Sequence, residues 1–171
     1  MMTMVLRETR VAVTGWVAGL TLALAACSGK GAVKNDSAFA AVQQRGQAVM
    51  GVDQYTASHI FEDLPDGGRV VLDRDDASDT TGIRTIRDHM RVIEAAFRRG
   101  DFALPGQVHN QEVPGTRVMR ERREAITYAA ADRPRGAELR MTTTDSAALA
   151  AIRDFLAFQR SDHRAAGHDS H

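Results

Sequence analysis

The stretch GIRTIRDHMRVIEAAFRR, residues 82–99, carries the most regular pattern of the chain. Its apolar residues recur at the three- and four-residue spacing of an α-helix. They are Ile83, Ile86, Met90, Ile93 and Phe97. Most arginines of the stretch fall on the opposite face. The pattern therefore predicts an amphipathic helix that packs on a core, with Ser78 or Asp79 as its N-cap and Gly100 as its stop.

A later stretch repeats this pattern. Residues 145–163 read DSAALAAIRDFLAFQRSDH, and their apolar stripe contains Leu149, Ile152 and Leu156. The tripeptide Ile-Arg-Asp occurs in both stretches, at 86–88 and at 152–154. A second amphipathic helix follows from this spacing, with Asp145 or Ser146 as its N-cap.

A pair of strands precedes each predicted helix. Residues 58–73, SHIFEDLPDGGRVVLD, place two β-favouring runs around a Pro-Asp-Gly-Gly turn. Residues 125–131 and 137–144 flank a second proline- and glycine-containing turn, DRPRG. Aligning Asp79 with Asp145 superimposes the Ile-Arg-Asp tripeptides, and a three-residue slip superimposes the turns. We therefore predict an α+β fold of two ββα units, forming a four-stranded antiparallel sheet with two main helices on one face.

The remaining segments complete the predicted domain. Residues 28–35 are small and polar and predict a flexible tether, and a short helix begins at Asp36 or Ser37. Residues 101–115 predict an irregular crossing, and residues 117–124 a short charged helix. One domain then spans residues 36–163, followed by a flexible histidine-containing tail at 164–171. The second face of the sheet needs the N-terminal helix, a partner or water.

The N-terminus has the features of an export signal. Arg7 and Arg10 precede an apolar run at 11–23 that is shorter than the ~20 residues of a membrane span. The run ends in Leu-Ala-Ala-Cys-Ser-Gly at 24–29, which resembles the lipobox of bacterial lipoproteins. That resemblance makes residues 1–27 a lipoprotein signal peptide and Cys27 the lipid-bearing residue. An ordinary secretory signal followed by an incidental cysteine is the alternative.

This signal sets the expected location and partners. The protein is expected to be exported and anchored in the membrane of the bacterial cell envelope, at the outer membrane or the periplasmic face if the cell is Gram-negative. The formal net charge is zero, so no basic field would attract nucleic acid. Cys27 is the single cysteine, which excludes an intrachain disulfide and an all-cysteine metal site.

Several catalytic motifs are absent from the sequence. It contains no G-x-S-x-G, no G-x-x-x-x-G-K, no H-E-x-x-H and no C-x-x-C. Acyl transfer on a nucleophile elbow, nucleotide chemistry on a P-loop, zincin-type hydrolysis and thiol redox chemistry thus lose their usual signatures.

Histidines are the remaining candidates for a site. His59 lies in a predicted strand, His89 on the first patterned helix, His109 in the crossing and His163 at the end of the second helix. Their positions border the predicted core, and neutral imidazole binds copper, zinc or iron, so these four residues are candidate metal ligands. Met50, Met90, Met119 and Met141 are possible thioether ligands for cuprous ion. Hydrogen-bonded histidines and core methionines are the plain alternatives.

A second, looser group of histidines lies at the C-terminus. His163, His168 and His171 have spacing that allows weak chelation of a divalent metal. A solvated tail that carries histidines incidentally is the alternative.

Much of the mature chain also resembles a known group of proteins. The matching segments include Val-Met-Gly-Val-Asp-Gln at 49–54, Ile-Arg-Asp-His-Met at 86–90, the crossing from His109 to 115, and Phe-Leu-Ala-Phe-Gln at 155–159. Residues 48–163 as a whole resemble a group of small exported bacterial proteins without an established activity. Members are sometimes labelled aspartate carbamoyltransferase, although this chain is short and has no recognisable carbamoyl-phosphate loop. The resemblance includes all four histidines and implies a shared site.

Three functions follow from these observations. The first is a lipid-anchored envelope binding protein that holds a transition metal or a small ligand through its histidines. The second is a structural lipoprotein whose open sheet face docks a membrane-protein partner. The third is a metal-dependent envelope enzyme in which a histidine-bound metal activates water.

Overall fold

The computed structural model describes residues 29–165, and the side chains of residues 36–165. The helices are α1 (Gly29–Met50), α2 (Thr80–Arg98), α3 (Ala103–His109), α4 (Thr116–Glu121) and α5 (Ser146–His163). The strands are β1 (Ala57–Leu64), β2 (Gly67–Arg74), β3 (Ile126–Arg133) and β4 (Gly136–Thr143). Two short 3₁₀ turns, η1 (Gln54–Thr56) and η2 (Arg123–Ala125), precede β1 and β3.

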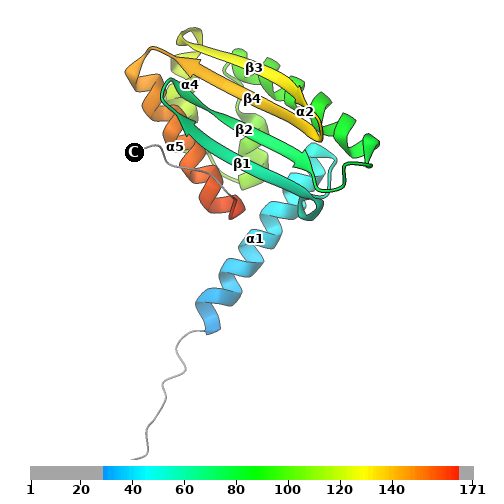
Figure 1. Cartoon of the computed structure of the whole chain (residues 1–171). Helices are drawn as coiled ribbons and strands as arrows, with labels where there is room; N and C mark the ends of the chain where they lie inside the picture. The colour runs from blue at the N-terminus through cyan, green and yellow to red at the C-terminus, as the bar shows by residue number, and fades with distance from the viewer. Residues whose placement is uncertain (1–28, 166–171) are drawn as a thin grey trace, which may run out of the picture.

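The four strands form one antiparallel sheet in the order β1-β2-β4-β3. The helices gather on one side of this sheet, and the N-terminal part of α1 extends away from it (Figure 1). The predicted α+β fold is thereby confirmed: two ββα units share one sheet, and α2 and α5 cover the same face. None of the helices within residues 29–165 has the length and hydropathy of a membrane span.

The two hairpins meet at the centre of the sheet in a symmetric way. Adding 69 to a residue number in the first hairpin gives the equivalent residue of the second hairpin. Gly67 thus corresponds to Gly136, and Val70 corresponds to Leu139. Val70 lies opposite Leu139, so the pseudo-twofold axis passes through this pair. The backbone N–H of Arg74 donates to the carbonyl of Arg135, and its counterpart, the N–H of Thr143, donates to that of Asp66. The repeat predicted from the sequence is therefore a repeat in three dimensions.

Two equivalent glycines allow β2 and β4 to approach. A Cβ atom on Gly67 would lie 2.0 Å from the carbonyl oxygen of Met141. A Cβ atom on Gly136 would lie 1.9 Å from the carbonyl oxygen of Leu72. The same offset of 69 relates these two contacts. The first positions of the two inner strands, Gly67 in β2 and Gly136 in β4, therefore have no room for any side chain.

The helices begin as predicted and pack crosswise. The side chain of Asp79 accepts from the N–H of Gly82 at the start of α2, and that of Asp145 accepts from the N–H of Ala148 at the start of α5. Helix α2 packs mainly on β3 and β4, whereas α5 packs mainly on β1 and β2. Each helix therefore covers the hairpin of the other unit. Several residues of the predicted stripes are fully buried: Ile86, Met90, Ile152 and Leu156.

Two segments differ from the prediction. Helix α1 begins at Gly29, so most of the predicted tether at 28–35 is helical. A helix whose C-terminal half is packed extends with little further penalty, because nucleation is the costly step. The predicted irregular crossing at 101–115 contains α3, in which Pro105 occupies the first turn and needs no N–H partner. Asn110 ends α3 with a φ of 53°.

The short helix predicted at 117–124 corresponds to α4, whose Met119 is fully buried. Helix α1 contacts α2, α3 and α5 and so lies on the helical side of the sheet. It does not cover the second face of the sheet, which was one of the predicted possibilities.

The second face of the sheet carries ion pairs. Arg69 lies 2.5 Å from Glu62 and 3.7 Å from Glu138, and Arg133 lies 3.1 Å from Glu138 and 3.2 Å from Asp73. Ion-paired charged side chains therefore lie on this face. Among residues 36–165, the exposed large hydrophobic side chains are Tyr55 and Val92, and neither lies in the sheet. The described surface thus offers no broad apolar face for a docking partner.

Candidate functional site

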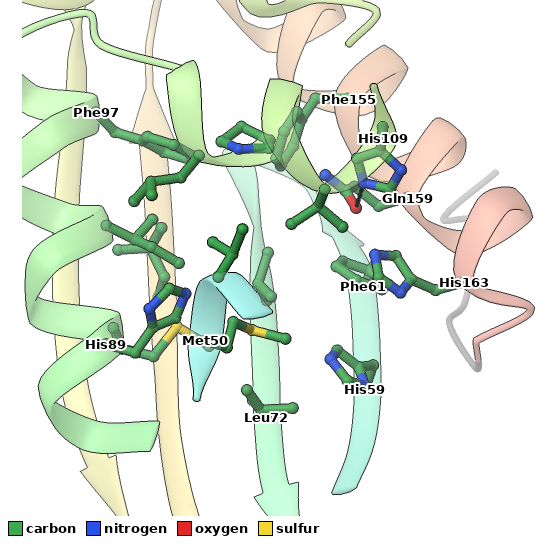
Figure 2. Close-up of a pocket in the computed structure, with 18 residues that line it drawn as sticks. Met50, His59, Phe61, Leu72, His89, Phe97, His109, Phe155, Gln159 and His163 are labelled. Carbon is green, nitrogen blue, oxygen red and sulfur yellow. Dashed lines mark hydrogen bonds between the residues drawn. The ribbon is translucent and has the colours of Figure 1, made fainter. Parts of the chain in front are cut away.

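A cavity lies between the sheet and its helices (Figure 2). Its volume is about 80 Å³, several times the space that one water molecule needs. Strands β1, β2 and β4 form its floor, α2 and α5 its sides, and α3 and the end of α1 its cover. The lining residues are Val49, Met50, His59, Phe61, Val70, Leu72, His89, Met90, Ile93, Phe97, Leu104, Pro105, Val108, His109, Leu139, Phe155, Gln159 and His163.

The wall of this cavity is apolar except for four histidines and Gln159. All four histidines predicted from the sequence thus line one cavity. Burial of the apolar side chains explains how the walls form, because both helices turn their hydrophobic stripes toward the sheet. The polar side chains are exceptions to this packing and need an explanation of their own.

His59 from β1 and His163 from α5 form a stacked pair. Their ring centroids lie 5.2 Å apart with the planes inclined by 14°, and Phe61 lies beside both rings. Nε2 of His59 and Nδ1 of His163 are buried and have no hydrogen-bond partner within the described part of the chain. Two polar atoms therefore lie unsatisfied at one end of the cavity, where each carries a desolvation penalty of ~1–3 kcal/mol.

Both rings of this pair are neutral at neutral pH. Burial lowers the pKa of His59 from 6.5 to about 4, although the Asp75 carboxylate and the backbone of Ala57 oppose that shift. Burial, together with the neighbouring His59 and His109, lowers the pKa of His163 from 6.5 to about 3. A neutral imidazole has one N–H donor and one nitrogen acceptor, so each ring can donate or accept a hydrogen bond.

His109 differs from this pair because both of its nitrogens have partners. Its Nδ1 donates to the Asp162 carboxylate at 2.5 Å, and its Nε2 lies 2.9 Å from Oε1 of Gln159. Its ring lies edge-on to that of His163, with centroids 5.0 Å apart. Asp162 is partly exposed and fixes the ring from the solvent side. His109 therefore orients the polar end of the cavity without offering a free nitrogen.

His89 lies on α2, away from the other three histidines (Figure 2). Burial lowers its pKa below the ordinary value of 6.5. Met50 lies on the same side of the close-up, at the end of α1. His89 thus shares the cavity with the stacked pair but belongs to the opposite wall.

The arrangement does not form the metal site that the sequence suggested. Within residues 36–165, no three histidine, cysteine, aspartate or glutamate side chains are placed to hold a metal ion. The nearly parallel rings of His59 and His163 cannot direct their in-plane lone pairs at one point, and the nitrogens of His109 already have partners. Copper, zinc or iron binding by the four histidines stays a prediction that this geometry does not favour.

The other candidate ligands fall in different places. Met50 and Met90 line the cavity, whereas the fully buried Met119 and Met141 do not. His163 of the predicted tail cluster is a buried cavity residue, and His168 and His171 lie outside the described residues. Cys27 and the signal segment also lie outside them.

Sequence reasoning missed the partners of His109. Gln159 and Asp162 are three residues apart on α5, and Gln159 lies four residues before His163, so the three share one helical face. That spacing was a usable signal. The missing information was the position of α3, because a predicted irregular crossing gave no reason to place His109 against this face.

The internal repeat gives each half of the site a counterpart. In the hairpins, where equivalent residues differ by 69 in number, His59 corresponds to Tyr128. In the helices, where Asp79 corresponds to Asp145 and the difference is 66, Phe97 corresponds to His163. Phe97 and Tyr128 are in contact, with centroids 5.7 Å apart. The fold therefore accommodates a phenylalanine and a tyrosine where the other half holds two histidines.

Comparisons with known proteins add no further evidence on the site. Neither the protein-family models nor the curated proteins nor the solved structures include one that matches this chain. The likeness to small exported bacterial proteins thus stays a prediction from the sequence.

Proposed function

We propose that this protein is a lipid-anchored binding protein of the cell envelope, whose cavity takes up a small uncharged organic molecule. One observation carries the proposal: two buried histidine nitrogens at one end of a mostly apolar cavity have no hydrogen-bond partner within residues 36–165. Ligand sites in proteins typically combine apolar walls with a few polar groups that fix orientation. The charged second face of the sheet supports this function over a docking role.

An organic ligand fits the donor set better than a metal ion does. A metal needs converging lone pairs, whereas a hydrogen-bonding ligand can contact two parallel rings separately. The absence of charge on His59 and His163 at neutral pH also favours an uncharged ligand, because a charged one would be desolvated without compensation.

Benzene binding tests whether the cavity is accessible to such a molecule. An engineered apolar cavity of about 150 Å³ binds benzene. The cavity of this protein is smaller, about 80 Å³, so benzene is a stringent probe of access to it. We expect saturable chemical-shift changes at cavity residues when benzene is added to the purified protein. Ile93→Trp fills the cavity and should abolish them, whereas Val92→Trp, on the exposed face of the same helix, should not. Unchanged spectra of the native protein would refute a ligand cavity, and a stoichiometric metal found by elemental analysis would replace it with a metal site.

Lipid labelling tests the proposed anchor. Cells grown with an alkyne-bearing palmitate analogue should incorporate it into the wild-type protein and retain that protein in the membrane fraction. Cys27→Ser removes the acceptor thiol and should abolish the label, whereas Ser28→Ala beside it leaves the thiol in place. A wild-type protein that is exported without label would show an ordinary secretory signal instead.

A further inference from the structure

We infer that the ligand is a small phenol-like molecule, whose hydroxyl group donates a hydrogen bond to Nε2 of His59 while its ring occupies the apolar part of the cavity. This inference rests on the proposed function and specifies the chemistry of its ligand. It follows from the two unpartnered nitrogens, the shape of the cavity walls and the internal repeat.

Nε2 of His59 and Nδ1 of His163 lack a hydrogen-bond partner within residues 36–165. Buried polar atoms in folded proteins nearly always have a hydrogen-bond partner, and two exceptions on neighbouring rings indicate that the partner is not among the described residues 36–165. A hydroxyl group is the smallest group that both donates and accepts. It can therefore satisfy an unpartnered imidazole nitrogen whether that nitrogen accepts or donates.

The contact of His59 with the backbone of Ala57 determines which of its nitrogens accepts. A hydrogen bond with the backbone of Ala57 favours the protonated form of the His59 ring, as expected when a carbonyl accepts a proton from that ring. Since Nε2 of His59 has no partner, this bond belongs to Nδ1. Nε2 is then an acceptor, and the hydroxyl group donates to it.

The side chains that line the cavity indicate what the body of the ligand is. Three phenylalanines, Phe61, Phe97 and Phe155, line the cavity together with aliphatic side chains. Flat rings pack well in such surroundings through offset-stacked and edge-to-face contacts. A cavity volume of about 80 Å³ favours a ligand with a small body over a larger one. A carboxylate or ammonium group would meet no opposite charge on the described wall.

The internal repeat shows that packing does not require the histidines. In the equivalent place, Phe97 and Tyr128 form an aromatic pair in the same backbone setting. The repeat also supplies conservative variants for the test. His163→Phe introduces the residue that the first unit has at this helix position, and His59→Phe keeps an aromatic ring on β1 while removing its nitrogens.

The experiment compares phenol with benzene on the purified protein. We expect phenol to bind at least tenfold more tightly than benzene, and the His59→Phe/His163→Phe variant to bind both with equal affinity. Val92→Phe serves as the matched exposed control and should keep the preference of the native protein. A native protein that binds benzene and phenol equally would overturn the inference and leave the proposed function intact. A protein that binds neither would refute both.

A spectroscopic measurement keeps the test independent of variant folding. In ¹⁵N-histidine-labelled native protein, phenol should move the Nε2 resonance of His59 in the direction of a hydrogen-bonded acceptor. Benzene should leave that resonance within the range of a ring-current effect. A phenol complex whose His59 Nε2 resonance stays where benzene puts it would contradict the proposed contact.

Discussion

Gly136→Ala is expected to lower the free energy of unfolding by about 3 kcal/mol or more. The added methyl group would lie 1.9 Å from the carbonyl oxygen of Leu72. This oxygen belongs to the backbone, so it cannot move aside as the end of a flexible side chain would. Relief of this contact requires β2 and β4 to separate at the centre of the sheet. Native domains have only ~5–15 kcal/mol of stability, so a large fraction would be lost. Urea unfolding followed by circular dichroism measures the effect.

Gly106→Ala provides the matched control. The nearest atom to its added methyl group is a carbonyl oxygen at 3.5 Å, which is an ordinary contact, and the residue lies within α3. Alanine in a helix is favoured over glycine by ~0.8–1 kcal/mol, so this variant should be as stable as the native protein or more so. Equal stability of Gly136→Ala and Gly106→Ala would show that the two inner strands are not paired as described.

Lowering the pH from 7 to 5 is expected to reduce the free energy of unfolding by roughly 3 kcal/mol. His59 and His163 have pKa values of about 4 and about 3 in the folded protein and 6.5 when exposed. Between pH 6.5 and 4, the unfolded chain therefore binds more protons than the folded one, and stability falls with pH. The Asp75 carboxylate opposes this effect at His59, and His109 adds to it at His163.

Carboxylates do not explain such a change in this pH range. The pKa values of Asp66, Asp76 and Asp145 are lowered from 3.8, so these groups lose their stabilising charge only at lower pH. Urea unfolding at pH 7, 6 and 5 provides the measurement. The His59→Phe/His163→Phe variant should lose most of this pH dependence, and the remainder is expected from His89, whose pKa burial also lowers. A native protein with constant stability from pH 7 to 5 would mean that the two rings are not buried in neutral form.

Most of the fold was predictable because local patterns and the repeat agree. The two amphipathic stretches fixed α2 and α5, and the two proline- and glycine-containing turns fixed the hairpins. Helix α3 was missed because Pro105 and Gly106 normally indicate a loop, and only the position of Pro105 in the first turn makes it compatible with a helix. The charged composition of β2 and β4 on one face also left open what covers it.

The candidate site was predictable only in part. The spacing of His89 and His163 relative to the hydrophobic stripes placed both at the border of the core, and the cavity contains them. The stacking of His163 on His59 could not be read from the sequence, because it depends on α5 crossing to the hairpin of the other unit. This stacking also determines that their nitrogens do not converge on a metal.

The crosswise packing of α2 and α5 has a consequence for how the chain folds. Each helix buries most of its hydrophobic face on the strands of the other unit, so we expect neither half to fold independently. The pairing of Val70 with Leu139 joins the two hairpins, so the surface on which each helix packs is complete only when β2 and β4 are paired. Contacts this far apart in sequence slow folding but make the transition cooperative. The site and the sheet centre should therefore be gained and lost together.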